Sequence, residues 1–223
     1  MVSDKQKLNV DDAYALETPE DSVRLYGEWA ETYDTNFVVS SGYIVYLKVA
    51  EQLIQQRSSI NGAVLDVGCG TGIVGARLRE GGIALVDGVD ISEPMLTEAG
   101  KKKTTDGLPV YRKLIAADLT KKLHIADNQY AGLVSAGTFT HGHLGPESLD
   151  ELWRVAAPGA YCAIGVRTTH YESMDFATKL SVDVDSGIIT PPELITADMY
   201  SAQASSPDHA NDKAYIVVCQ VVK

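Results

Sequence analysis

The chain has 223 residues, of which 45% are hydrophobic and 22% charged, and its formal net charge at pH 7 is −11. This length and apolar fraction suit one folded domain and exclude a chain that is disordered throughout. The negative charge repels phosphate backbones and anionic lipids, so neither nucleic acid nor membrane is an expected partner. The three cysteines are odd in number and far apart, which fits neither a disulfide framework nor a zinc site. No segment resembles a signal peptide or a membrane span, so we expect a cytoplasmic protein.

Two helices are predicted near the amino terminus. Thr18 suits an N-cap and Pro19 suits the first helical position. Apolar and aromatic residues then recur at spacings of three and four, which predicts one apolar face formed by Val23, Tyr26, Trp29, Ala30 and Tyr33. The same spacing predicts a second helix over residues 43–54.

From about residue 62 onward the hydrophobic pattern becomes that of an alternating α/β protein. Short β-rich runs occupy residues 63–68, 83–90, 110–118, 130–137 and 160–166, and helical segments occupy 72–80, 92–103 and 146–157. This alternation predicts a parallel sheet with helices on both faces. Two further strands, 194–200 and 214–222, have no helix between them and are expected to pair antiparallel at one edge. The predicted fold is therefore a Rossmann-like, doubly wound, seven-stranded sheet, mostly parallel, with a carboxyl-terminal edge hairpin.

The glycine-rich stretch "GCGTGIVG", residues 68–75, allows two interpretations. Read from Gly70 it fits G-x-G-x-x-G, the loop that holds a dinucleotide pyrophosphate. Read from Asp66 as "DVGCGTG", it fits a turn that holds an amino acid attached to a nucleoside. In both cases the missing side chains let the backbone approach a ligand closely.

Three carboxylates end three successive predicted strands. Asp66 favours a ligand with an ammonium group over a pyrophosphate, although bonding to nearby backbone amides is the alternative. Asp90 can bind a ribose diol under either interpretation, or can begin the turn into the next helix. Asp118 can accept a hydrogen bond from an adenine amine, with Leu119 and Ile91 as apolar faces for the ring. The order of the three acids favours a nucleoside ligand.

The stretches "VLDVGCGTGIVG", "VDGVDIS", "AADL" and "ELWRVAAPGAYCAIGV" resemble the successive motifs of class I S-adenosylmethionine-dependent methyltransferases over about residues 62–168. More loosely, "TPEDSVRLYGEWAETYDTNF" resembles the helical cap of small-molecule methyltransferases, particularly the Williams–Beuren-region methyltransferase-like group. The resemblance implies one methyltransferase domain over residues 1–223, with a cap over 1–58 and a cofactor-binding core over 59–223. It also implies S-adenosylmethionine as cofactor and S-adenosylhomocysteine as its product.

The same resemblance implies the residues that hold this cofactor. The glycine loop and Asp66 would serve the methionine moiety, Asp90 the ribose, and Asp118 with Leu119 the adenine, while Tyr33 would lie beside the cofactor. The aromatic stripe of the first helix has a plain alternative as hydrophobic core. The full expected set is Tyr26, Trp29, Tyr33, Asp66, Gly68, Cys69, Gly70, Thr71, Gly72, Asp90, Ile91, Met95, Asp118, Leu119, Ala136 and Gly137.

Acceptor activation is expected in "SAGTFTHGHLGP", residues 135–146, which follows the fourth strand of the core. His141 and His143 are candidate general bases, and Tyr33 joins them as a candidate catalytic residue. The two histidines have alternatives, namely bonding to backbone or orienting substrate. No third ligand supports a metal at His-x-His, so no metal is predicted. The remaining histidines receive no role.

The function expected from the sequence is methyl transfer by in-line displacement to an oxygen, sulfur or nitrogen nucleophile of a small molecule. The acidic charge and the absence of an Asn/Asp-Pro-Pro-Tyr/Phe motif favour a small molecule over a nucleic-acid base. Two alternatives stay open: an NAD(P)-dependent oxidoreductase, and a catalytically idle cofactor-binding or scaffold protein on the same fold. No oligomeric state is predicted.

Overall fold

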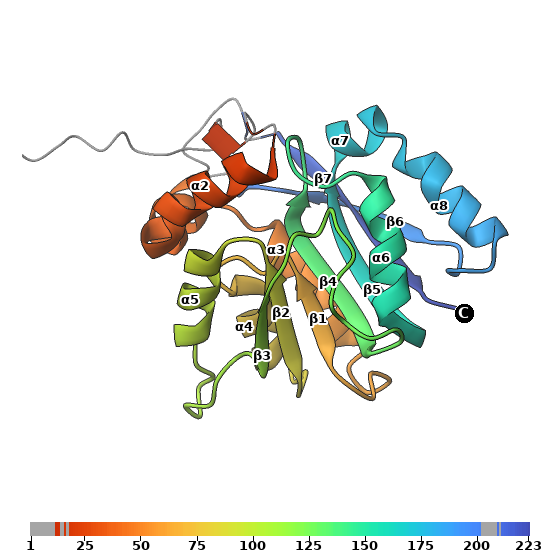
Figure 1. Ribbon diagram of the computed structural model, residues 1–223, viewed down its shortest axis with the longest axis horizontal. Helices are drawn as coiled ribbons and strands as arrows, with labels where there is room; N and C mark the ends of the chain where they lie inside the picture. Colours follow the sequence, from red (N-terminus) through yellow and green to blue (C-terminus); the bar gives the residue numbers. More distant parts are fainter. Residues whose placement is uncertain (1–11, 14–15, 17, 202–208, 210) are drawn as a thin grey trace, which may run out of the picture.

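A seven-stranded sheet with the order β3-β2-β1-β4-β5-β7-β6 forms the centre of the fold (Figure 1). The computed structural model describes residues 12–13, 16, 18–201, 209 and 211–223. Residues 1–11 of the expected cap, with 14–15 and 17, therefore lie outside the described residues, as do 202–208 and 210 of the loop between the last two strands. The strands are β1 (Val64–Val67), β2 (Val86–Asp90), β3 (Lys113–Ala116), β4 (Tyr130–Phe139), β5 (Ala156–Arg167), β6 (Glu193–Asp198) and β7 (Lys213–Gln220).

Strands β1 to β5 pair in parallel, whereas β7 pairs antiparallel with β5 and with the edge strand β6. This confirms the predicted sheet, including its antiparallel edge pair. Strand β1 is buried at every position, as expected for a central parallel strand with both faces covered.

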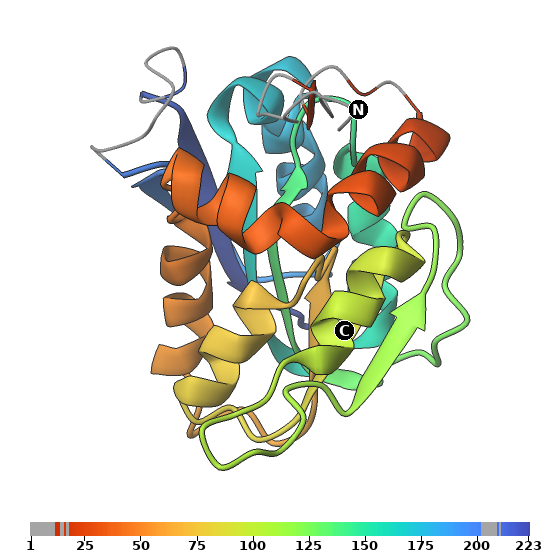
Figure 2. The same ribbon diagram turned by 90° about the vertical axis from the view of Figure 1, so that its left-hand side faces the viewer.

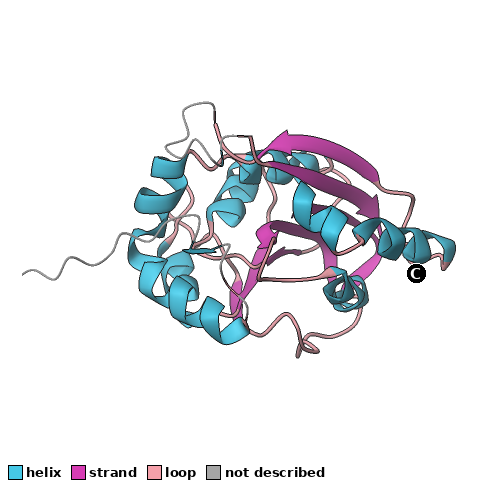
Figure 3. Ribbon diagram, turned by 90° about the horizontal axis from the view of Figure 1, so that it is seen from above, coloured by secondary structure: helices cyan, strands magenta, loops and turns pink. Residues whose placement is uncertain are grey.

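Helices cover both faces of the sheet (Figure 3). One core packs against α3 and α4 through residues such as Val49, Leu53 and Leu78, and a second packs against α6 and α8 through Trp153 and Phe176. The helices are α2 (Pro19–Trp29), α3 (Val45–Gln55), α4 (Ile73–Glu80), α5 (Glu93–Lys101), α6 (Leu149–Val155), α7 (Thr168–Ser173) and α8 (Phe176–Asp185). Shorter turns are η1 (Ala30–Thr32), η2 (Tyr33–Val39) and η3 (Pro146–Ser148).

Helix α2 begins where the sequence predicts. The hydroxyl oxygen of Thr18 accepts a hydrogen bond of 3.1 Å from the backbone N–H of Asp21, and Pro19 opens the helix. From there α2, η1 and η2 cross the molecule above α4 and α5, at the edge where the parallel strands end (Figure 2). The predicted apolar face is wrong at Val23, which is 41% exposed, because Leu25 packs inward instead.

Three other expectations about the elements need correction. The helix predicted over 146–157 stops at Val155, because β5 begins at Ala156 and carries a register shift opposite β4 between Ala156 and Tyr161. Helices α7 and α8 were not predicted, although Asp175 caps α8 by accepting a hydrogen bond from the Thr178 N–H. Both helices follow β5 and pack over the face that carries α6 (Figure 1).

Candidate active site

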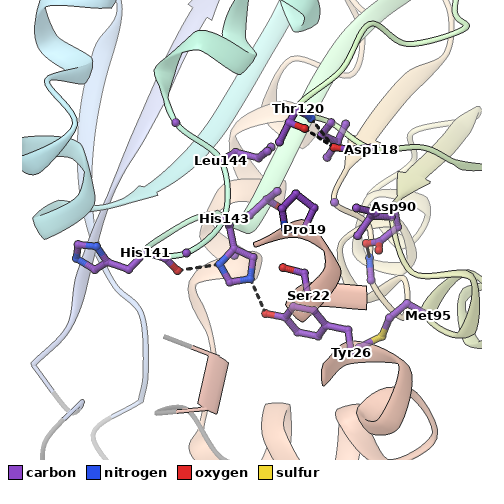
Figure 4. Close-up of a pocket in the computed structure, with 18 of the residues that line it drawn as sticks. Pro19, Ser22, Tyr26, Asp90, Met95, Asp118, Thr120, His141, His143 and Leu144 are labelled. Carbon is purple, nitrogen blue, oxygen red and sulfur yellow. Dashed lines mark hydrogen bonds between the residues drawn. The ribbon is translucent and has the colours of Figure 1, made fainter. Parts of the chain in front are cut away.

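A cavity of about 360 Å³ lies at the carboxyl ends of the parallel strands (Figure 4). Its wall combines α2, η2, the loops that follow β1 to β4, and α7. This is the edge of a doubly wound sheet where ligands bind, and the volume falls within the range of small-molecule sites.

Most of the residues predicted from the sequence meet in this wall. They are Tyr26, Tyr33, Gly68, Gly70, Asp90, Ile91, Met95, Asp118, Leu119, Ala136, Gly137, His141 and His143. Five of the predicted residues do not line the cavity, namely Trp29, Asp66, Cys69, Thr71 and Gly72. The wall also contains residues that the sequence analysis did not single out, among them Ser22, Thr138, Leu144, Glu147, His170 and Met174.

Asp90 ends β2 and fixes the glycine loop. Its Oδ2 accepts a hydrogen bond of 2.8 Å from the Gly70 N–H, and its Oδ1 accepts one of 2.9 Å from the Ser92 N–H. Burial raises the pKa of Asp90, and these backbone hydrogen bonds oppose that rise. A carboxylate oxygen has two acceptor positions, so each oxygen can take a further hydrogen bond from a ligand hydroxyl.

Gly70 lies opposite Asp90 in a backbone conformation that favours glycine. Its φ is +52°, and a Cβ built on it would meet no atom within 4 Å. The space in front of Gly70 belongs to the cavity. The loop is thus open to a ligand at this position.

Asp118 lies beyond the end of β3 and is held by its own turn. Its Oδ1 accepts hydrogen bonds from the N–H and the hydroxyl of Thr120, at 2.9 and 2.6 Å, and its Oδ2 pairs with the Lys121 ammonium at 2.8 Å. Partial burial acts to raise the pKa of Asp118, but the hydrogen bonds from Lys121 and Thr120 hold it below its usual value. The carboxylate therefore stays ionised beside the apolar side chains of Leu119 and Ile91 in the same wall.

Asp66 does not reach the cavity. It is fully buried, and the phenol of Tyr111 donates a hydrogen bond of 2.7 Å to its Oδ2. Burial raises the pKa of Asp66 to about 7, against the lowering effect of the Tyr111 hydrogen bond. The partner of this strand-end carboxylate is thus a side chain of the protein, which the sequence analysis did not consider.

Tyr111 also explains two of the glycines. A Cβ on Gly72 would lie 2.8 Å from the Tyr111 ring, and a Cβ on Gly75 would lie 2.3 Å from its hydroxyl. Both positions thus leave room for this aromatic side chain beneath α4. At Gly72 and Gly75, glycine is therefore required by packing against Tyr111 rather than by contact with a ligand.

The other three residues outside the wall have structural partners. Trp29 is 2% exposed and packs edge-to-face against Tyr33, with ring centroids 5.3 Å apart. Cys69 is buried beneath the glycine loop. The Thr71 hydroxyl donates to Asp34 of η2 at 2.5 Å, which ties the glycine loop to the amino-terminal segment.

Tyr33 lines the cavity as an uncharged phenol. Burial, followed by the neighbouring Tyr26 and Tyr43, raises the pKa of Tyr33 well above its usual value. At neutral pH this side chain can donate a hydrogen bond and present its ring to a ligand.

His143 joins the loop after β4 to helix α2. Its Nδ1 lies 2.9 Å from the carbonyl oxygen of His141 and 3.0 Å from the hydroxyl of Thr140, while its Nε2 lies 3.0 Å from the hydroxyl of Tyr26. Burial lowers the pKa of His143, so the imidazole is neutral at pH 7. Figure 4 shows Tyr26 and His143 facing each other in the cavity.

His141 and His170 complete this part of the wall. His141 Nε2 lies 3.3 Å from the Thr169 hydroxyl, and its ring centroid is 5.3 Å from that of His170. His170 is buried, with its Nε2 2.8 Å from the carbonyl oxygen of Leu144. The sequence did carry a signal for His170, since it follows the carboxyl end of a predicted parallel strand, where the ligands of such sheets bind.

Within the described ranges, no three His, Cys, Asp or Glu side chains come together as a possible metal-ligand set. Among the helices of the same ranges, none has the length and apolar character to cross a bilayer.

The wall fits a nucleoside bearing an amino-acid chain. Asp90 keeps acceptor positions for a sugar diol, Gly70 leaves open space for close approach, and Ile91 and Leu119 supply apolar surfaces for a base. The order of these groups along three strand ends, on a seven-stranded sheet with an antiparallel edge pair, agrees with the arrangement that the resemblance to class I methyltransferases implies.

Comparisons with known proteins agree with this class. A family model described as a methyltransferase domain matches residues 64–159. Human methyltransferase-like protein 27 is 29% identical over 149 residues, a match that spans 66% of this chain and 58% of that protein. The chain thus covers less than two thirds of its human relative.

Solved structures show the same fold. Magnesium protoporphyrin IX methyltransferase from Synechocystis PCC 6803, crystallised with S-adenosylmethionine, superposes with a TM-score of 0.62 at 18% identity, covering 94% of this chain and 99% of that one. The [4+2]-cyclase SpnF superposes with a TM-score of 0.67 at 12% identity, covering 93% and 98%. Residues 64–159 of the chain thus match a methyltransferase domain, and its fold is the one found in solved S-adenosylmethionine-dependent methyltransferases.

Proposed function

We propose that this protein transfers the methyl group of S-adenosylmethionine to a small-molecule acceptor bound in the cavity. One observation carries the proposal: a single continuous wall contains the strand-end groups suited to the nucleoside, Asp90 and Asp118, and the polar groups Tyr26, His141 and His143. A cofactor and an acceptor can therefore meet within one site.

In this proposal the two regions of the wall have different tasks. Asp90, Gly70, Ile91 and Leu119 bind the nucleoside, while Gly68 and the loop after β1 approach the amino-acid chain. Bound S-adenosylmethionine supplies an electrophilic methyl carbon on a positively charged sulfur. Alignment of the acceptor with that carbon is the main contribution of the protein, since positioning alone lowers such barriers by several kcal/mol.

We assign Asp66, Cys69, Thr71, Gly72 and Trp29 to support of the site. Asp66 and Gly72 hold Tyr111, and Thr71 ties the glycine loop to η2. Met95, Ala136 and Gly137 stay in the proposed cofactor set because they lie in the wall.

The domain organisation is part of the same proposal. Of the expected cap over residues 1–58, α2 and η2 would cover the site, because they contribute Ser22, Tyr26 and Tyr33 to the wall, whereas α3 packs on the sheet with the core of residues 59–223. The volume of the cavity, about 360 Å³, and the negative net charge support a small molecule as acceptor.

The test is transfer of a labelled methyl group. The protein is incubated with methyl-labelled S-adenosylmethionine and a metabolite extract, and the products are separated by chromatography. The proposal predicts a labelled small molecule that is absent with Asp90→Ala. Tight binding of S-adenosylhomocysteine without any labelled product would instead favour a catalytically idle protein.

A further inference from the structure

We propose that Tyr26 and His143 form a proton-accepting pair that activates an uncharged acceptor, an alcohol, a phenol or an amine, with Tyr26 in contact with the acceptor. The inference rests on the proposed function and adds the group that removes the acceptor's proton. The two side chains come from α2 and from the loop after β4, 117 residues apart, and both line the cavity.

The hydrogen bonds of His143 fix its protonation pattern. A carbonyl oxygen can only accept, so Nδ1, 2.9 Å from the His141 carbonyl oxygen, must carry the ring proton and donate it. In a neutral imidazole Nε2 then holds the lone pair. The Tyr26 hydroxyl, 3.0 Å from Nε2, must therefore donate to it.

Because the Tyr26 hydroxyl donates its proton to His143, its oxygen can only accept a hydrogen bond from any other neighbour. A phenol has one proton, which is used on His143, so every further hydrogen bond to its oxygen is one that the oxygen accepts. An acceptor molecule in the cavity would thus donate its X–H proton to Tyr26. Because the Tyr26 hydroxyl already occupies Nε2 of His143, the proton of the acceptor would reach His143 through Tyr26.

The Tyr26–His143 pair receives the proton that the acceptor loses during methyl transfer. It also takes up the positive charge that leaves the sulfur atom. The nucleophile's lone pair forms the bond to the methyl carbon while the carbon–sulfur bond breaks and its electron pair returns to sulfur. The nucleophile's proton moves to the Tyr26 oxygen as the Tyr26 proton moves to Nε2 of His143. The reaction begins with a positive charge on sulfur and ends with one on the imidazolium, so no net charge is created in the buried site.

Burial and two neighbouring groups bear on the base strength of His143. Burial, together with the nearby His170, lowers its pKa, while the carbonyl oxygen of His141 acts in the opposite direction and favours the protonated ring. The resting imidazole is consequently neutral, and the carbonyl is placed to stabilise the imidazolium that the transfer produces.

Two variants separate proton transfer from simple orientation. Tyr26→Phe keeps the ring and removes the hydroxyl. His143→Gln places an amide oxygen where Nε2 lies, so it still accepts from Tyr26 but cannot take a proton. Tyr161→Phe, in β5 and away from the cavity, is the matched control.

The first measurement is the histidine NMR spectrum of the full chain, labelled with ¹⁵N-histidine and saturated with S-adenosylhomocysteine. We expect the proton of His143 on Nδ1 at pH 8, and a shift of its Nε2 resonance in Tyr26→Phe but not in Tyr161→Phe. A proton on Nε2, or an Nε2 resonance unchanged by loss of the Tyr26 hydroxyl, would overturn the proposal.

The second measurement is methyl transfer to a panel of phenols, alcohols, amines and thiols. For a hydroxyl acceptor, both variants should lower kcat about 100-fold or more, the usual contribution of a general base, with unchanged affinity for S-adenosylhomocysteine. For thiol acceptors that are already ionised, the two variants should lower kcat much less. Wild-type kcat in His143→Gln would show that His143 only orients Tyr26. Failure of S-adenosylhomocysteine to bind the wild type would instead contradict the proposed function, independently of the NMR result.

Discussion

The phenol of Tyr111 donates a hydrogen bond of 2.7 Å to the carboxyl group of Asp66, and both side chains are buried beneath the glycine loop. The bond joins β1 to the segment that leads into β3, 45 residues further along the chain. It gives a donor to Oδ2 of a strand-end acid whose burial is costly, while Oδ1 is buried without a hydrogen bond in the described part of the chain.

Loss of this hydrogen bond should destabilise the fold. Tyr111→Phe leaves a buried carboxyl group without its donor, so we expect the free energy of unfolding to decrease by about 1–3 kcal/mol. Urea unfolding followed by circular dichroism measures the change. Tyr161→Phe is the control, because no hydrogen bond of its hydroxyl is found in the described part of the chain. Equal stabilities of the two variants would show that the bond contributes nothing.

The pH dependence of stability should report Asp66. Burial raises its pKa to about 7, whereas an aspartic acid in an unfolded chain titrates near 4. Between these values the unfolded chain has already lost a proton that the folded protein keeps, so stability decreases as pH rises from about 4 to about 7. Asp66→Asn should flatten this slope, leaving the contribution of Asp90, whose pKa burial also raises. Urea unfolding at several pH values across this window tests the prediction, and a slope equal to that of the wild type would refute it.

The strand ends, with their acids and glycines, could be predicted from the sequence, because short apolar runs that stop at Asp or Gly mark where parallel strands end. Asp90 and Gly70 therefore appear in the wall as expected. The partner of Asp66 could not be predicted, since the Tyr111 contact depends on how distant segments pack. For the same reason the helical period identified the aromatic face of α2 but not which aromatic ring points into the cavity, Tyr26 or Trp29.

The two helices after β5 are not predicted from the sequence, although part of the signal for α8 is present. Asp175 precedes Phe176 and Leu180, two buried residues at a spacing of four, which is the start of an amphipathic helix. The sequence prediction gives His170 no role, although the residue follows the carboxyl end of a predicted parallel strand. Its place in the wall follows from the position of α7 at the carboxyl end of β5.

Removal of the Asp90 charge should weaken cofactor binding. In Asp90→Asn the amide nitrogen cannot accept the Gly70 N–H, so the loop loses a hydrogen bond and the ribose loses an ionised acceptor. We expect the Kd for S-adenosylhomocysteine to rise about 10- to 100-fold, as for the loss of charged hydrogen bonds. Isothermal titration calorimetry measures it, with Asp198→Asn on the edge strand β6 as control. Unchanged affinity would remove Asp90 from the cofactor site.

Asp34 should hold the amino-terminal segment on the glycine loop. It accepts from Thr71 of that loop at 2.5 Å and pairs with the ammonium group of Lys102 after α5. Asp34→Ala should increase hydrogen exchange across residues 19–39 and raise the dissociation rate of S-adenosylhomocysteine several-fold, while the sheet exchanges as before. Lys102→Met, which keeps the Thr71 bond, should show a smaller effect. Exchange equal to that of the wild type in Asp34→Ala would show that other contacts hold the segment.

The most direct test of the whole account is a crystal structure of the protein with S-adenosylhomocysteine. The account predicts its ribose hydroxyls on the carboxylate of Asp90, its adenine between Ile91 and Leu119, and its sulfur facing the part of the cavity that holds Tyr26 and His143. A ligand bound elsewhere, or one whose sulfur is separated from Tyr26 by the protein, would contradict it.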